Sequence, residues 1–145
     1  MNEVAFVRFQ PEHLFLIDLL PDQRAWLEAA IDDGHLAQVA QLNSAWTGIA
    51  DGRILGSAGF IPHGFHCSRA WAMFGQGIPR WAWPPIVGKI RHEMRRGPKR
   101  IEATVKDGFG NGCRLAHLLG FTVEGKMRAW GPDGADYFLY AQVKP

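Results

Sequence analysis

Cysteine is scarce in this sequence, and long hydrophobic runs and internal repeats do not occur. The two cysteines, Cys67 and Cys113, are too few for a disulfide framework, so we expect reduced thiols in a cytoplasmic protein. No stretch approaches the roughly 18 apolar residues of a membrane span, and we expect no membrane partner. The first residues lack a basic region followed by an apolar run, which argues against a signal peptide.

The sequence also has no large excess of positive or negative charge. The formal net charge is +2, which by itself indicates no polyanionic partner. Six of the sixteen basic residues nevertheless lie close together, at Lys89, Arg91, Arg95, Arg96, Lys99 and Arg100. A solvated helix face explains this group most simply. A phosphate-bearing ligand is the second interpretation, and nucleic acid is the third, because no nucleic-acid-binding motif surrounds the group.

What the chain does have is an ordinary globular composition, with 47% hydrophobic and 21% charged residues among 145. We expect one domain over residues 1–145, large enough to fold without a disulfide or a metal. The clearest local signal is Asp51-Gly52 between the apolar runs 44–50 and 53–61. Such a dipeptide is typical of a β-hairpin, because the turn needs positive φ angles.

Hydrophobic periodicity predicts an alternation of strands and helices. Strands are expected at 4–9, 44–50, 53–61, 69–75, 100–105, 121–130 and 136–143. Helices are expected at 11–20, 23–33, 85–96 and, briefly, within 112–119, with a helical turn or loop at 35–43 and irregular segments at 63–68 and 76–85. This order predicts an α+β (mixed α/β) fold: a mostly antiparallel sheet of about seven strands, helices on both faces, and a parallel β-α-β crossover over 69–105.

Several boundaries follow from single residues. Pro21 is expected to end the first helix, and Asp22 to cap the second. Gly88 weakens the helix 85–96 and suggests that another group approaches closely there. Gly120 should end the short helix "GCRLAHLLG", and Phe121 should begin a strand whose inner side also carries Val123.

The segments "VKDGFGNGCRLAHLLGF" and "VEGKMRAWGPDGADYFLYAQV", together with the order of elements, resemble the GNAT superfamily, the Gcn5-related N-acetyltransferases. The likeness is closest to a branch encoded by phages and prophages, whose members share the run "LGF–EG–MR–GPDG–DY–LYA". The resemblance implies an N-acetyltransferase that transfers an acetyl group from acetyl-CoA to an unidentified amine. The alternative is a catalytically silent GNAT-like phage or prophage protein with a structural or binding role.

The family binds acetyl-CoA in a V-shaped gap between its fourth and fifth strands, which correspond here to 69–75 and 100–105. The resemblance places the pantetheine arm beside Ala72, Met73 and Phe74, and the pyrophosphate at the start of the next helix. Gln76 and Gly77 fall where the family has its phosphate loop, but the spacing differs from the family motif.

Prolines also change this segment, because Pro79, Pro84 and Pro85 cannot supply the N–H donors that a phosphate cradle uses. Arg80 and Lys89 are the expected replacements as phosphate partners. The alternative is a proline-stiffened loop that only covers the core.

The family's usual proton donor, a tyrosine on the short helix, corresponds to Ala116 in this chain. Tyr137 and Tyr140, on opposite faces of the last strand, are the candidate substitutes. Candidates for the general base are Glu102, Glu124 and His66. Burial of Glu102 in the gap would raise its pKa, as a base requires, whereas a solvated strand residue paired with Arg100 or Arg128 is the simpler interpretation.

Other ligands and partners are less well supported by the sequence. His63, His66 and Cys67 form the only candidate zinc group, and they lack a fourth ligand at a suitable spacing, so we expect no metal. The expected partners are a small-molecule or peptide amine, and a second copy of the chain or a phage protein. The expected location is the bacterial cytoplasm or the virion.

Overall fold

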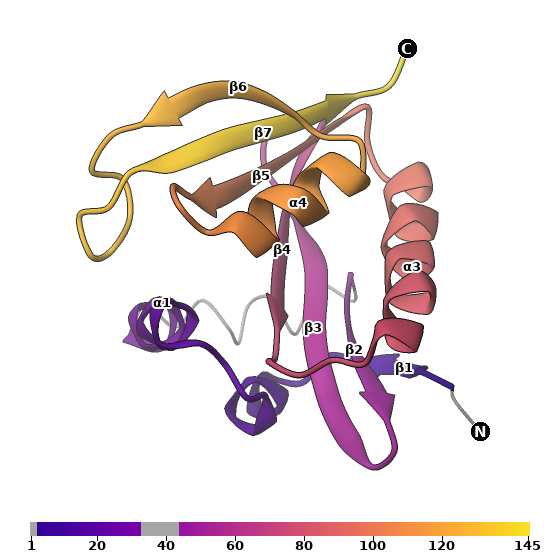
Figure 1. Ribbon diagram of the computed structural model, residues 1–145. Coiled ribbons are helices and arrows are strands. Elements are labelled where there is room, and N and C mark those ends of the chain that lie inside the picture. The colour runs from indigo at the N-terminus through magenta and orange to yellow at the C-terminus, as the bar shows by residue number, and fades with distance from the viewer. Residues whose placement is uncertain (1–2, 33–43) are drawn as a thin grey trace.

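The computed structural model describes residues 3–32 and 44–145, so the turn or loop expected at 35–43 lies outside the described residues. The described chain forms a seven-stranded sheet with helices packed against it (Figure 1). The strands are β1 (Ala5–Arg8), β2 (Ala45–Ala50), β3 (Arg53–Pro62), β4 (Cys67–Phe74), β5 (Arg100–Lys106), β6 (Thr122–Met127) and β7 (Tyr137–Val143). The helices are α1 (Pro21–Asp32), α3 (Trp83–Arg96), α4 (Gly110–Leu118) and the short 3-10 helices η1 (Pro11–Leu16) and η2 (Arg80–Ala82).

The strands follow one another in the sheet in the order β1-β2-β3-β4-β5-β7-β6. Every neighbouring pair is antiparallel except β4 and β5, which are parallel and joined through α3. The expected α+β fold, with its mostly antiparallel sheet and central crossover, is therefore confirmed. No described helix has both the length and the apolar character needed to cross a membrane.

Two groups of buried side chains cover opposite faces of the sheet, as β4 shows most clearly. Phe74 packs in the core under α3 and α4, whereas its neighbour Met73 packs with Leu14 of η1 and Leu27 of α1. Successive strand residues point to opposite faces, so these are two separate cores. The prediction of helices on both faces is confirmed.

The hairpin between β2 and β3 has the turn that its sequence predicts. Asp51 and Gly52 have φ angles of 52° and 72°, and Ala50 pairs with Arg53 across the turn. Gly120 likewise has a φ of 89° immediately after α4. Both turns need the left-handed backbone region, which glycine enters without steric cost.

The N-terminal helical segment differs from expectation. Only Pro11–Leu16 is helical, and it is a 3-10 helix. Its start is held by a hydrogen bond from the Gln10 N–H to Nδ1 of His13, and that ring nitrogen also lies 2.7 Å from the hydroxyl of buried Thr47. A contact with β2 therefore determines the local conformation, which periodicity within the segment could not predict.

The starts of two helices also differ from expectation. Pro21 begins α1, and Asp22 is an exposed first-turn residue that pairs with Lys106 at 3.2 Å. α3 begins at Trp83, so Pro84 and Pro85 lie inside its first turn. Prolines are tolerated there because the first N–H groups of a helix have no intrahelical partner.

The strand expected at 121–130 is shorter and faces differently. Phe121 is buried just before β6, as expected for a core anchor, but Val123 is 49% exposed. A register shift between Val123 and Gly125 interrupts the pairing with β7. Such a bulge breaks the simple alternation of faces, so the inward position expected for Val123 is wrong.

Candidate functional site

The parallel strands β4 and β5 pair along only part of their length. The pairs are Cys67 with Arg100, Ser68 with Ile101, and Arg69 with Glu102. Beyond that point β4 continues to Phe74 and β5 to Lys106 without a mutual ladder, and Figure 1 shows the two strands diverging. Backbone groups on the facing edges are thus available to a ligand. The family resemblance implies a V-shaped gap at this place.

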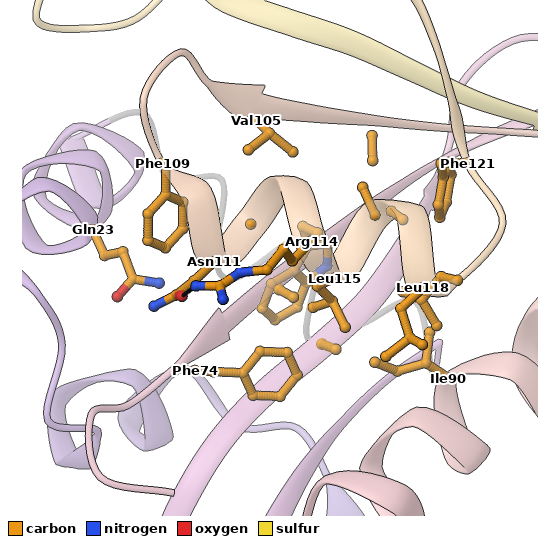
Figure 2. A pocket seen from close by; sticks show the side chains of 18 of the residues that line it. Gln23, Phe74, Ile90, Val105, Phe109, Asn111, Arg114, Leu115, Leu118 and Phe121 are labelled. Atoms are coloured by element: carbon orange, nitrogen blue, oxygen red, sulfur yellow. Dashed lines mark hydrogen bonds between the residues drawn. The ribbon is translucent and has the colours of Figure 1, made fainter.

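A cavity of about 680 Å³ lies on the α3–α4 side of this gap. Its walls come from β4, β5, both helices and the loop that follows β4, and they are mostly apolar. Figure 2 shows Phe74 of β4, Val105 of β5 and Leu115 of α4 around this space. Ligand pockets of this size and character commonly enclose a small molecule and orient it with a few polar groups.

A second cavity, of about 370 Å³, lies on the α1 side and includes Trp26, Met73 and Tyr137 in its wall. Trp71, Ala72 and Thr104 line both cavities. The cavities therefore adjoin one another at the gap between the strands. The indole N–H of Trp71 is buried and has no hydrogen-bond partner among residues 3–32 and 44–145.

Most of the residues expected to bind the cofactor, whether beside its arm or in the phosphate loop, lie at these cavities. Phe74, Gln76 and Gly77 line the larger one, Met73 lines the smaller one, and Ala72 lines both. The Gln76–Gly77 turn is held from outside, because Arg53 donates hydrogen bonds to both of their carbonyl oxygens.

The two expected phosphate partners lie elsewhere. Arg80 is exposed on η2 and is not part of either cavity wall. The ammonium of Lys89 lies 5.4 Å from the ring centroid of Trp46 and pairs with Glu93 at 3.1 Å. Lys89 therefore belongs to the packed face of α3.

The first residues of α3 offer no free N–H group to the phosphate cradle that the family resemblance implies. The N–H of Ala82 donates to the carbonyl of Pro79, and the N–H of Trp83 donates to the carbonyl of Arg80. The next two residues, Pro84 and Pro85, have no N–H. The cavity thus fits an extended apolar arm with an amide backbone, but the helix start does not fit a diphosphate.

Glu102 lies at the closed end of the gap, and its side chain is only 12% exposed. It accepts hydrogen bonds from Arg69 at 3.1 Å and from Arg100 at 2.9 Å. Burial alone would raise the pKa of Glu102, but the two arginines outweigh it and lower that pKa. The simpler interpretation, pairing with Arg100, is therefore confirmed, and Arg69 is a second partner that the sequence did not reveal.

The other two candidate bases lie outside both cavity walls. Glu124 on β6 binds Arg100, and these hydrogen bonds hold the pKa of Glu124 below its usual range. His66 is exposed in the loop between β3 and β4, where its carbonyl accepts the N–H of Arg100. Arg100 thus forms hydrogen bonds with all three candidate bases. It lies where β4 and β5 are still paired, and not in the open part of the gap.

The two tyrosines of β7 lie on opposite faces of the sheet, as predicted. Tyr140 is 2% exposed and packs edge-on against His117 of α4, and burial, together with the thiol of Cys113, raises its pKa to about 12. Tyr137 lines the smaller cavity, and burial raises its pKa as well. Tyr137 is thus the candidate acid that lies at a cavity.

The sequence interpretation missed polar residues in the wall of the larger cavity. Arg114 and Asn111 lie one turn apart on α4, and Gln23 comes from α1 (Figure 2). A signal for Arg114 existed, since it adjoins Leu115 and precedes Leu118 by one helical turn, on a helix expected to border the gap. For Gln23 and Trp71 the sequence held no comparable signal.

No protein-family model and no curated protein sequence matches this chain. Solved structures do match it. A putative acetyltransferase from Acinetobacter baylyi has a TM-score of 0.72 at 15% identity, covering 100% of this chain and 96% of that one. A GNAT-family acetyltransferase from Bacillus cereus has a TM-score of 0.68 at 12% identity, covering 99% of each chain.

A putative acetyltransferase from Salmonella typhimurium, solved with its cofactor acetyl-CoA, has a TM-score of 0.64 at 18% identity, covering 99% of this chain and 95% of that one. At such low identities the likeness establishes the fold. The chain therefore has the GNAT fold, as its sequence predicts.

Proposed function

We propose that this protein is an N-acetyltransferase that transfers an acetyl group from acetyl-CoA to an amine. The observation that carries the proposal is the gap between β4 and β5, with a cavity on either side that shares residues of both strands. Acetyl transfer requires a thioester and an amine to meet at one point. Two cavities that adjoin at a gap in the sheet allow this meeting.

The linings of the two cavities support a division of roles. The larger one is mostly apolar and borders the free edges of β4 and β5, which suits a thioester arm with amide groups. The smaller one has Tyr137 in its wall, whose hydroxyl suits a polar acceptor. The acceptor is a small-molecule or peptide amine in this proposal.

Transfer also requires a group that returns a proton to the departing thiolate. Tyr137 is protonated at neutral pH, since its pKa lies above the ordinary value of 10.0 for tyrosine. It also lies in the wall of the smaller cavity, so we assign it this role. The roles of Glu102, Glu124, His66 and Tyr140 stay predictions from the sequence.

The test is thermal denaturation with and without acetyl-CoA, followed by a variant that blocks the gap. A ligand at a hundredfold excess over its dissociation constant stabilises the folded state by about 2.7 kcal/mol. Ala72→Phe should abolish the shift, because Ala72 borders both cavities. Ala25→Phe, at an exposed alanine of α1 outside both cavity walls, should leave it unchanged. A shift that survives Ala72→Phe would refute the assignment of the gap.

A second candidate function is a silent GNAT-like protein of the phage or prophage branch, with a structural or binding role and a phage protein or a second copy as partner. Two observations favour it: Ala116 stands where the family has its tyrosine, and the start of α3 has no cradle for a diphosphate. Absence of any thermal shift at millimolar acetyl-CoA would support this candidate over the enzyme.

A further inference from the structure

If the proposed function holds, this chain must bind the outer, anionic end of an acyl donor. The start of α3 offers no cradle, since the N–H groups of Ala82 and Trp83 are engaged and Pro84 and Pro85 have none. A ligand that carries phosphate needs a cationic or N–H partner somewhere along its length. Another residue of this chain must therefore provide the partner for the phosphate.

Arg114 is the one charged residue in the wall of the larger cavity, as far as the described chain shows. The rest of that wall is apolar, apart from a few neutral polar side chains and backbone groups. Figure 2 shows the guanidinium extending from α4 toward Asn111 and Gln23, above the ring of Phe74. A cation at the edge of an otherwise apolar cavity matches a ligand with an apolar arm and an anionic end.

The guanidinium is oriented but not neutralised. Its Nη2 donates a hydrogen bond of 2.6 Å to the Asn111 side-chain oxygen, three residues earlier on α4. Within residues 3–32 and 44–145, Arg114 has no carboxylate partner, whereas Arg69 and Arg100 both bind Glu102. A guanidinium has further N–H donors in a planar fork that fits a phosphate. Asn111 therefore positions a group that can still bind an anion.

We propose that Arg114 binds a single phosphate at the outer end of a phosphopantetheine arm, and that the arm lies in the larger cavity with its thioester in the gap. The ligand class is an acyl thioester of phosphopantetheine, of which acetyl-CoA is one member. Because the start of α3 contributes no donors, the second phosphate and the nucleoside of acetyl-CoA add little affinity. A side chain of α4 thus binds the phosphate, in place of N–H groups at the start of α3.

The experiment measures the affinities of three probes by isothermal titration calorimetry: acetyl-CoA, S-acetyl-phosphopantetheine and S-acetylpantetheine. For the unaltered protein, the first two should bind within about threefold of each other. The third, which lacks phosphate, should bind about tenfold to a hundredfold more weakly, the range expected for loss of a charge-assisted hydrogen bond.

Arg114→Gln should weaken the two phosphorylated probes to the level of S-acetylpantetheine and leave S-acetylpantetheine unchanged. Arg114 is exposed, so this variant should fold, and circular dichroism checks that it does. Arg80→Gln is the matched control, an exposed arginine outside the cavity wall, and it should change none of the three affinities.

The possible failures are distinguishable. If acetyl-CoA binds and Arg114→Gln leaves its affinity unchanged, or if Arg80→Gln weakens it instead, the role of Arg114 is refuted and the proposed function stands. If acetyl-CoA binds more than about tenfold tighter than the monophosphate probe, the single-phosphate site is refuted. If none of the probes binds the folded protein at millimolar concentration, both proposals fail.

Discussion

Glu102 shows how a single residue's chemistry depends on neighbours that are remote in sequence. It is mostly buried, which alone would make it a better base. Arg69 lies 33 positions away in the sequence, yet it donates a hydrogen bond to the same carboxylate as Arg100. Held between two guanidinium groups, Glu102 is a structural anion that joins β4 to β5 where their pairing ends.

At the residue scale, this pairing predicts a pH-dependent stability. Because the folded-state pKa of Glu102 lies below its ordinary value of 4.5, its contribution is complete above that pH and is lost as the pH falls through the folded-state pKa. Glu102→Gln should lower the free energy of unfolding by about 1–3 kcal/mol at pH 7. Urea denaturation at a series of pH values measures both effects.

The difference between the unaltered protein and Glu102→Gln should shrink as the pH falls below 4.5. Glu124→Gln is the control, because Glu124 binds the same Arg100 but is considerably more exposed, so its loss should be smaller. A difference that stays constant from pH 7 to pH 3 would show that the ionised carboxylate contributes nothing.

Among the elements, α3 has two prolines in its first turn and open space beside Gly88 in its middle. Pro84 and Pro85 fit its first turn, and that fit removes the donors on which a phosphate cradle depends. Gly88 suggested a close approach by another group. The structure shows nothing within 4 Å of the place where its Cβ would be, so that expectation is wrong.

Gly88→Ala should therefore stabilise the protein by about 0.5–1 kcal/mol, because alanine loses less backbone entropy on entering a helix. The measurement is the free energy of unfolding in urea. Gly120→Ala should have the opposite effect, since Gly120 has a φ of 89° and an added Cβ would lie 2.9 Å from Nε2 of Gln142. Destabilisation by Gly88→Ala would indicate a contact at that position.

At the scale of the whole molecule, the sheet consists of two parts that β4 and β5 join through only three residue pairs. On one side, β3 and β4 pair along seven positions, and on the other, β5 and β7 pair along seven. This boundary between β4 and β5, the seam of the sheet, has fewer paired residues than any other pair of neighbouring strands described. The two cavities open along this seam.

Amide hydrogen exchange should report this arrangement. We expect the β4 amides at 70–74 that face β5 to exchange faster than the amides of β3 and β4 that pair with each other, because the former have no ladder partner. Saturating acetyl-CoA should slow the exchange of these amides and leave the β2–β3 hairpin unaffected. Equal protection of both groups in the free protein would contradict an open gap.

Features that depend on neighbouring residues could be predicted from the sequence. Asp51-Gly52 specifies a hairpin through its φ angles, and Gly120 with Phe121 specifies how α4 ends and where the chain re-enters the core. The alternation of strands and helices was enough to predict the α+β fold, and the resemblance of the C-terminal segments to the GNAT superfamily implied the GNAT fold.

The point at which β4 and β5 separate, the pairing of carboxylates with cations, and the cation in the cavity wall could not be predicted in this way. These features depend on contacts between residues far apart in the chain, such as Arg69 with Glu102. Arg80 lies near the expected phosphate position in sequence but is exposed and is not part of the cavity wall, whereas α4 packs against β5 and places Arg114 in that wall. Packing between distant elements sets side-chain direction, and local sequence does not encode it.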